Sequence, residues 1–198
     1  MKWYNYNIRD LTDAEYSKWY SLMSKDKQHC VDRFRFVDDK KRTICGEMLA
    51  RKAIAEWCGT TPESISFGIK EHGKPYVKDL PVEFNISHSG DTVVCAVDDK
   101  PIGIDIEKIR LIDLTVAKRI CTDEEILYLF GHNPEEQDFT YTTDTEILTR
   151  FFKLWTAKEA YGKCIGTGLS NGKLQPFNCR CLLLSGYVIA ISKHTKKD

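Results

Sequence analysis

Long apolar runs are missing from this sequence of 198 residues. No run approaches the ~20 apolar residues that a membrane-spanning helix needs, and the first residues hold neither a long apolar segment nor a small-residue cleavage site, so we expect no signal peptide. An excess of one charge is missing too, because 29 Lys and Arg balance 29 Asp and Glu. A global field that attracts nucleic acid or anionic membranes is therefore not indicated, and we expect a cytoplasmic protein that binds neither.

Paired cysteine motifs are scarce, although the chain has eight cysteines. The one close pair is Cys179 and Cys181, whose spacing suits one face of a β-strand, and no second pair at zinc-type spacing accompanies it. The other cysteines are scattered, several of them within apolar helix or strand patterns. In a cytoplasmic chain this distribution indicates reduced, mostly buried thiols and argues against a zinc site.

Two long apolar helices dominate the expected secondary structure. The first begins near Asp38 or Asp39, either of which could cap it, and runs to about Trp57 before ending at Gly59. The second runs from about residue 144 to 163. A helix as apolar as the first is expected to be central in its part of the molecule.

Shorter elements surround these helices. Thr12 with Glu15 and Thr122 with Glu125 form capping boxes that open two helices, and Gly131 ends the second. The remaining expectations are a basic, polar stretch at 25–35, a helix near 113–121, a surface loop over 132–143, and strands over 2–8, 65–69, 84–87, 92–97, 102–107, 175–184 and 187–192. Although no convincing sequence repeat relates the halves, we predict an α+β fold of two similar lobes, 1–101 and 102–198, each a long helix packed on a small, mostly antiparallel sheet.

Two carboxylates follow one another on the strand over residues 102–107. Side chains alternate along a strand, so Gly103, Asp105 and Glu107 share one face, and the two acids stand roughly 7 Å apart at their bases, two rises of ~3.4 Å. They would repel each other unless a bound cation or a basic side chain offsets them, and Gly103 is expected to leave room for a bulky ligand. The alternative is an exposed strand face with solvated acids.

A third carboxylate favours a bound cation over an exposed strand face with solvated acids. The apolar stripe of the second long helix includes Phe152 and Trp155, and Glu159 follows on the same face, with Lys163 four residues further on. An ordinary Glu159–Lys163 surface pair is the alternative, but such a pair should not continue an inward-facing stripe. Carboxylates without a histidine or cysteine ligand pattern suit a hard ion, and we therefore favour Mg²⁺ over zinc.

Cations and hydroxyl groups on turns and element ends suit phosphate binding. Lys74 lies on the turn Gly73-Lys74-Pro75, and Ser87 and His88 lie where a strand ends. Arg42 and Thr43 begin the first long helix, and Lys27 and Arg33 lie upstream of it. Each of these signals is weak by itself, and their occurrence together with the three acids indicates a site for a phosphorylated ligand.

Four segments carry a family likeness, namely Gly73-Lys74-Pro75-Tyr76, Phe84-Asn85-Ile86-Ser87-His88-Ser89-Gly90, Ile102-Gly103-Ile104-Asp105-Ile106-Glu107 and Trp155-Thr156-Ala157-Lys158-Glu159-Ala160-Tyr161-Gly162-Lys163. In order and spacing they resemble the 4'-phosphopantetheinyl transferases of the Sfp type, the single-chain pseudodimeric class. The resemblance implies two lobes related by a pseudo-twofold axis, with the site at their junction. It also implies transfer of the 4'-phosphopantetheine moiety of coenzyme A to a serine of an apo acyl or peptidyl carrier protein.

The same resemblance implies roles for individual residues. Asp105, Glu107 and Glu159 would hold Mg²⁺, or Mn²⁺ in its place, together with the coenzyme A pyrophosphate, which Lys163 would contact. Lys158 stands where the family motif has its other lysine, and it would belong to the coenzyme A-binding residues as well. The residues that would bind the 3'-phosphoadenosine end are Lys74, Ser87 and His88, helped by Arg42, Thr43 and Lys27, while Cys30 stands where some relatives have a basic residue.

For the reaction, the carrier serine is expected to attack the β-phosphorus of coenzyme A and to release 3',5'-ADP. Glu159 is the candidate base, with Glu125 as the alternative, and Lys163 and Asp105 complete the catalytic set. The carrier is expected to dock near Arg110–Cys121, which mixes apolar and basic residues but could equally be an ordinary amphipathic helix. A monomer is expected, and the rival functions are a Mg²⁺-dependent hydrolase and a non-catalytic nucleotide- or carrier-binding module.

Overall fold

A computed structural model describes residues 1–198 except 70–72, 169–173, 176–177 and 195–198. Its strands are β1 (Lys2–Asn7), β2 (Phe67–Ile69), β3 (Pro75–Val77), β4 (Glu83–Ser89), β5 (Thr92–Asp98), β6 (Ile102–Lys108), β7 (Cys179–Leu184) and β8 (Tyr187–Lys193). Its α-helices are α1 (Asp13–Leu22), α2 (Lys25–Arg33), α3 (Val37–Cys58), α4 (Ala117–Ile120), α5 (Asp123–Phe130) and α6 (Thr145–Ile165). Short 3-10 helices occupy Ile8–Asp10, Pro62–Ser64, Leu114–Val116 and Glu136–Phe139.

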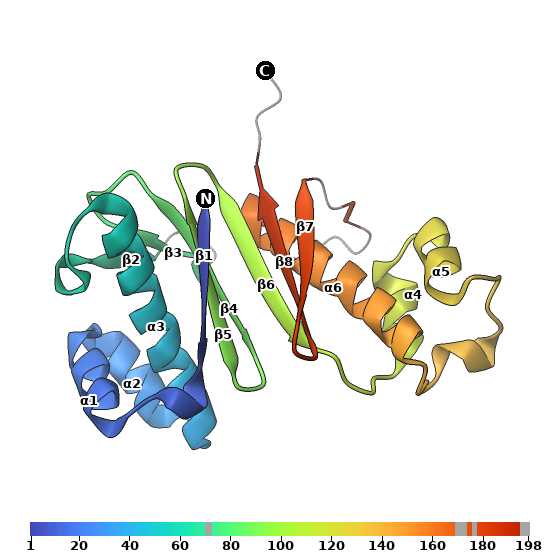
Figure 1. Ribbon diagram of the computed structural model, residues 1–198, viewed down its shortest axis with the longest axis horizontal. Helices are drawn as coiled ribbons and strands as arrows, with labels where there is room; N and C mark the ends of the chain where they lie inside the picture. The colour runs from blue at the N-terminus through green and yellow to red at the C-terminus, as the bar shows by residue number, and fades with distance from the viewer. Residues whose placement is uncertain (70–72, 169–173, 176–177, 195–198) are drawn as a thin grey trace.

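The N-terminal lobe is built on an antiparallel sheet of order β1-β5-β4. Helix α3 covers one face of this sheet, and α1 and α2 pack on α3 (Figure 1). The inner face of α3 carries Ile44, Met48 and Ile54, all fully buried, and burying such side chains contributes about 1.5–3 kcal/mol each. The expected central helix is confirmed.

The C-terminal lobe repeats this arrangement with β6-β8-β7 and α6. In both lobes the first strand lies at one edge, the last strand lies in the centre, and the strand before it lies at the other edge. Both long helices also end at a glycine in the left-handed region, Gly59 with φ 68° and Gly166 with φ 81°. The prediction of an α+β fold with two similar lobes, each a long helix on a small antiparallel sheet, is confirmed.

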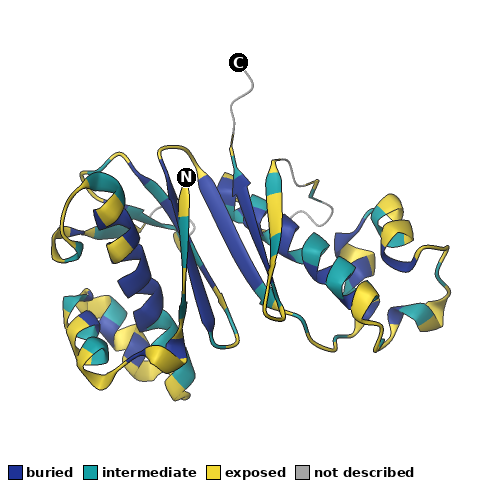
Figure 2. Cartoon of the chain, in the orientation of Figure 1, coloured by how far each residue is buried: buried dark blue, intermediate teal, exposed yellow. Residues whose placement is uncertain are grey.

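The two sheets meet in the middle of the molecule, where β4 lies beside β6. The amide oxygen of Asn85 accepts a hydrogen bond from the backbone N–H of Ile104 at 3.0 Å, and an aliphatic cluster between the sheets includes Val94, Ile104 and Ile189. Figure 2 shows β5, β6 and β8 as largely buried strands, whereas β7 at the outer edge is largely exposed. This contact brings β4, β6 and α6 together, which are the elements that carry most of the expected site residues.

Several boundaries differ from the sequence-based expectations. Helix α3 begins at Val37, so Asp38 and Asp39 lie in its first turn and neither caps it. Part of the basic, polar stretch forms α2, which the sequence did not reveal because its buried positions are few; Ser24 caps it. The helix expected over 113–121 is a 3-10 turn followed by only four α-helical residues, and the strand expected over 175–184 begins at Cys179, with 176–177 outside the described residues.

The expected surface loop over 132–143 contains a short 3-10 helix, and Tyr141 forms a β-bridge with Asp113. None of the helices within the described part of the chain is both long and apolar enough to span a membrane.

Candidate active site

The helix-facing side of β6 carries Gly103, Asp105 and Glu107, and its other side carries the buried isoleucines of the sheet interface. A Cβ atom added to Gly103 would lie 2.0 Å from the carbonyl oxygen of Ala160 and 2.5 Å from the backbone nitrogen of Cys164. The expectation that this glycine leaves room for a ligand is therefore wrong, because the backbone of α6 fills the space. Gly103 instead allows α6 to approach β6 closely enough to face Asp105.

Asp105 is buried at the centre of the site, with 4% of its surface exposed. Its Oδ1 atom accepts hydrogen bonds from the Ser87 hydroxyl at 2.7 Å and from the Lys163 ammonium at 2.6 Å. Its Oδ2 atom is buried without a hydrogen-bond partner among the residues that the structure describes. Burial raises the pKa of this carboxyl above its usual value, and the nearby charge of Lys163 opposes that shift.

Glu159 lies on α6 and faces the strand acids. It makes no hydrogen bond or ion pair with any residue of the described ranges, and its side chain is half-buried. Partial burial raises its pKa, and the negative charges of Asp105 and Glu107 raise it further, while Lys163 opposes them. The charges of the two strand acids therefore reach Glu159 on the helix.

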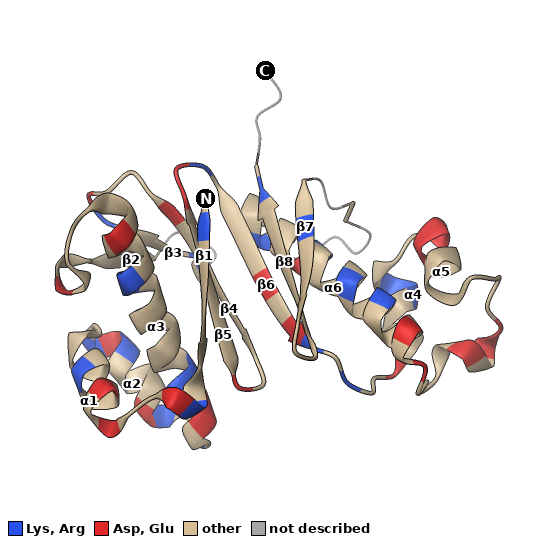
Figure 3. Cartoon of the chain, viewed as in Figure 1, with Lys and Arg blue, Asp and Glu red and all other residues tan. Residues whose placement is uncertain are grey.

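Glu107 is held by neighbours that sequence reasoning did not assign. Its Oε2 atom accepts hydrogen bonds from the Ser89 hydroxyl at 3.1 Å and from Arg110 at 3.1 Å, and Arg110 stacks over the Phe152 ring. The alternation of Asn85, Ser87 and Ser89 along β4 was a usable signal, since polar residues at every second position of a strand indicate a polar face. Figure 3 shows the acidic bands of β6 in the middle of the molecule.

The donor set fits a hard divalent ion, although the acids are not already gathered around a single point. Within the described ranges, no group of three His, Cys, Asp or Glu side chains is close enough to form a ready-made metal cluster. Three observations favour a fit: all the donors are carboxylate oxygens, Asp105 Oδ2 lacks a partner, and Glu159 is unpaired. The Lys163 ammonium supplies the positive charge that currently balances Asp105.

Residues from both lobes meet at Lys163. Its ammonium bridges Ser87 of β4, at 3.0 Å, and Asp105 of β6, and its backbone carbonyl accepts a hydrogen bond from Lys74 at 3.2 Å. The structure thus brings Lys74, Ser87, Asp105 and Lys163 together, as the sequence-based site requires. Glu83 lies near Lys74, with their charged atoms 4.0 Å apart.

A basic corner lies beside this centre, at the start of α3. Arg42 donates to the carbonyl of Gly90 at 2.9 Å and pairs with Asp39 at 2.6 Å, and the Thr43 hydroxyl donates to the Asp39 carbonyl at 3.0 Å. His88 is exposed on β4, and desolvation of its ring lowers its pKa, helped by the positive charges of Arg42 and Lys163. An anion bound here would meet these cations, but no salt bridge from Arg42 to the central acids is present in the described structure.

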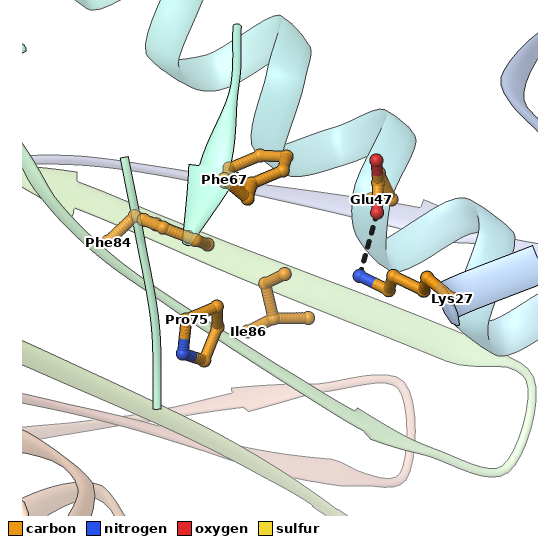
Figure 4. Close-up of a pocket in the computed structure, with 6 residues that line it drawn as sticks. All are labelled: Lys27, Glu47, Phe67, Pro75, Phe84 and Ile86. Carbon is orange, nitrogen blue, oxygen red and sulfur yellow. Dashed lines mark ion pairs between the residues drawn. The ribbon is translucent and has the colours of Figure 1, made fainter. Parts of the chain in front are cut away.

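Lys27 lies apart from the carboxylate centre. It pairs with the buried Glu47 at 2.7 Å, in a small open pocket that is otherwise walled by Phe67, Pro75, Phe84 and Ile86 (Figure 4). Arg51 also pairs with Glu47, at 2.8 Å. Cys30 is exposed on the same helix as Lys27, α2.

Lys158 is fully buried, and its partners lie outside the group of Asp105, Glu107 and Glu159. Its ammonium pairs with Glu125 Oε1 at 2.9 Å and donates to the carbonyl of Leu174. The Oε2 atom of Glu125 accepts from the backbone N–H of Thr122 at 2.7 Å, closing the capping box of α5. Both oxygens of Glu125 are thus occupied, which favours Glu159 over Glu125 as the candidate base.

Comparison with known proteins adds family matches to this geometry. Residues 10–100 match the family described as "4'-phosphopantetheinyl transferase, N-terminal", and residues 101–196 match the "4'-phosphopantetheinyl transferase superfamily". A 4'-phosphopantetheinyl transferase of Bacillus subtilis is 42% identical over 166 residues, which cover 83% of this chain and 70% of the relative. The 4'-phosphopantetheinyl transferase Sfp of Bacillus subtilis strain 168 is 40% identical over 166 residues with the same coverage, and HetI of a Nostoc species is 31% identical over 168 residues, 81% of this chain and 67% of that one.

Proposed function

The chain belongs to the 4'-phosphopantetheinyl transferase superfamily, and from that premise we propose that it transfers the 4'-phosphopantetheine moiety of coenzyme A to a serine of an apo acyl or peptidyl carrier protein, with release of 3',5'-ADP. The observation that carries this proposal is the meeting of Ser87 from one lobe with Asp105 and Lys163 from the other, opposite the unpaired Glu159. Such a set combines a buried carboxylate, a hydroxyl group and an ammonium in one contact network, with a free carboxylate close enough for its pKa to respond to their charges.

A divalent ion completes the proposed chemistry. Asp105, Glu107 and Glu159 are the residues that would hold Mg²⁺, or Mn²⁺ in its place, and the bound ion would neutralise the charge of the pyrophosphate. For Glu107 this requires sharing its carboxylate with Ser89 and Arg110. The buried oxygen of Asp105 without a partner is the best-prepared ligand of the three.

The protein's own groups would perform the transfer. Lys163 would release part of its contact with Asp105 to the pyrophosphate and stabilise the charge that develops on the leaving 3',5'-ADP. Glu159, directly or through a water molecule, would accept the proton of the carrier serine. Lys74, Ser87 and His88, with Arg42 and Thr43, would bind the phosphorylated adenosine end, and Lys27 could reach it only by leaving Glu47.

Lys158 is reassigned within this proposal. Because its buried ammonium is tied to Glu125 and to the Leu174 carbonyl, we propose that it fixes α5 against α6 and does not contact coenzyme A. The position of Glu159, the next residue along α6, depends on that anchoring.

The carrier is proposed to dock near Arg110–Cys121. Leu111 is 60% exposed, and the basic groups Arg110 and Arg119 lie in the same segment. Lys118 is already paired with Glu136 at 2.6 Å, so Arg119 is the better probe. Arg119→Glu should raise the KM for the carrier and leave the KM for coenzyme A unchanged; equal effects on both would reject docking here.

The experiment that tests the function measures the mass gain of several apo carrier proteins incubated with coenzyme A and Mg²⁺. The expected result is one phosphopantetheine per carrier with the wild type and almost none with Asp105→Asn. Transfer at the wild-type rate by Asp105→Asn would refute the assigned site. Release of 3',5'-ADP from coenzyme A without any carrier would instead indicate the hydrolase.

The cytoplasmic location and the monomeric state stay predictions, which fractionation and sedimentation would test.

A further inference from the structure

Two thiols lie side by side on β7, the outer strand of the C-terminal sheet. Cys179 and Cys181 are two residues apart, so both point to the same face, toward α6. The sulfur of Cys179 lies 3.8 Å from the carbonyl oxygen of Ala157, and that of Cys181 lies 3.9 Å from the carbonyl oxygen of Lys153. Because these carbonyls are one helical turn apart, the two sulfurs line up along the helix.

The two thiols also interact with each other. A hydrogen bond from Cys179 lowers the pKa of Cys181 to about 7, and the charge of Lys153 contributes to this shift. The same interaction, together with burial, raises the pKa of Cys179. Cys181 is exposed, in contrast to the buried thiols of Cys45, Cys95, Cys121 and Cys164. An accessible thiol with a lowered pKa and a second thiol beside it has the features of a reactive cysteine.

The N-terminal lobe shows that this position does not need cysteine for packing. The β4–β5 hairpin closes with the pair Ser89 and Thr92, and the β7–β8 hairpin closes with the pair Leu184 and Tyr187. Counting back from these pairs shows that Phe84 and Ile86 of β4 are equivalent to Cys179 and Cys181 of β7. Phe84 is 2% exposed and Ile86 packs against α3 at Gly46. The same scaffold thus uses large apolar side chains in one lobe and two small thiols in the other.

We propose that Cys179 and Cys181 form a bidentate site for a soft, thiophilic acceptor, such as Cd²⁺, Cu⁺ or trivalent arsenic. Thiolates select such soft acceptors over Mg²⁺ and Ca²⁺. No third His, Cys, Asp or Glu completes the pair within the described ranges, so the site differs from a closed four-ligand zinc site. It lies on β7, and the strand β8 stands between it and the carboxylates of β6.

Phenylarsine oxide is the probe, because it needs two neighbouring thiols. Each sulfur forms one As–S bond, the As–O bond breaks, and the oxygen leaves as water with the two thiol protons, while arsenic remains trivalent. The folded protein is treated with one equivalent, desalted and weighed intact by mass spectrometry, with Cd²⁺ titration followed by thiolate absorption as a second arm. Neither measurement uses coenzyme A or a carrier, so it does not depend on the proposed function.

The expected result is one arsenical per wild-type chain. Cys181→Ala and Cys179→Ser should each weaken retention roughly 10²-fold, because the second thiol binds intramolecularly, whereas the matched control Cys30→Ser, which removes another exposed thiol, should bind like the wild type. Thermal unfolding checks the fold, and Cys181→Ala keeps the test valid if the more buried Cys179→Ser variant fails to fold. Full retention by Cys181→Ala, or no adduct on the folded wild type, would overturn the proposal.

Discussion

The two lobes share one scaffold and differ in what the first strand presents to the long helix. Asn7 pairs with Thr92 in the N-terminal lobe, and Lys108 pairs with Tyr187 in the C-terminal lobe. Counting back along the strands from these pairs shows that Tyr4 of β1 is equivalent to Asp105 of β6, and that Tyr6 is equivalent to Glu107. The N-terminal lobe therefore fills with aromatic rings the positions where the C-terminal lobe has carboxylates.

The long helices show a matching exchange. When α3 and α6 are aligned by their terminal glycines, Gly59 and Gly166, Lys52 is equivalent to Glu159 and Glu56 is equivalent to Lys163. Glu56 forms an ion pair with Lys2 at 2.7 Å and, after burial, is the main cause of the raised pKa of Tyr4, about 12. At these equivalent positions, the C-terminal lobe has carboxylates on both the strand and the helix, as the proposed ion site needs, whereas the N-terminal lobe has one on the helix alone.

Each lobe has a buried cation on its long helix, which we assign a structural role. Arg51 and Lys158 occupy equivalent helix positions, and both are buried cations paired with an acid. Arg51 also donates to the carbonyls of Ile65 and Leu22, and Lys158 to that of Leu174. Each cation ties distant segments to its long helix, so the shared positions hold the scaffold and the differing ones carry the proposed chemistry.

The largest expected effect comes from one helix position tested in both lobes. Glu159→Gln should lower transfer by roughly 10²–10⁴-fold, because it removes the proposed base and a proposed ion ligand. Lys52→Gln, the matched change in the other lobe, should leave the rate near that of the wild type. Both rates are followed by the mass gain of an apo carrier, and similar losses in the two variants would remove the functional distinction between the lobes.

The buried cations give the next effect, measured as the free energy of unfolding in denaturant. Arg51→Met should cost about 3–5 kcal/mol, because it leaves Glu47, 2% exposed, with only the partly exposed Lys27. Lys158→Met should cost less, since Glu125 is 14% exposed and keeps its capping hydrogen bond. A larger loss in Lys158→Met would contradict this ranking.

Gly103→Ala tests the close approach of strand and helix. The added methyl group would meet the Ala160 carbonyl oxygen at 2.0 Å, and overpacking of this kind costs about 1–3 kcal/mol. In the N-terminal lobe the equivalent position on β1 carries Lys2, whose side chain is 50% exposed, so Lys2→Ala should change stability little. Unfolding midpoints of the two variants compare them, and a stable Gly103→Ala protein would show that α6 can move away.

Capping gives the smallest effect and should be equal in the two lobes. Thr12 and Thr122 each close a capping box, with Glu15 and Glu125 respectively. Thr12→Ala and Thr122→Ala should each cost about 1 kcal/mol in the free energy of unfolding. A markedly larger cost for Thr122 would show that the Glu125–Lys158 contact depends on the cap.

Much of the fold could be predicted because its signals are local. The capping boxes, the terminal glycines of the long helices and the alternation over Ile102–Lys108 all appear in adjacent residues. Helix α2 was missed because only Gln28 and Val31 are buried in it, too few to set a helical period.

The residues of the candidate site could be proposed from the sequence, but their ion-pair partners could not. Asp105, Glu159 and Lys163 follow from strand alternation and the helix stripe, whereas the partners of Lys27 and Lys158 are Glu47 and Glu125, distant in sequence. Nothing local reveals such tertiary ion pairs. Gly103 was misread for the same reason, since its neighbour is the backbone of a helix more than fifty residues away.

The central claim is that acids from one strand and one helix of the C-terminal lobe hold a divalent ion, and ion binding tests it most directly. Mn²⁺ affinity would be measured by electron paramagnetic resonance, with coenzyme A present, for the wild type, Asp105→Asn and the N-terminal counterpart Tyr4→Phe. The account predicts tight binding by the wild type and Tyr4→Phe and at least a roughly tenfold loss in Asp105→Asn. Unchanged Mn²⁺ affinity in Asp105→Asn would contradict it.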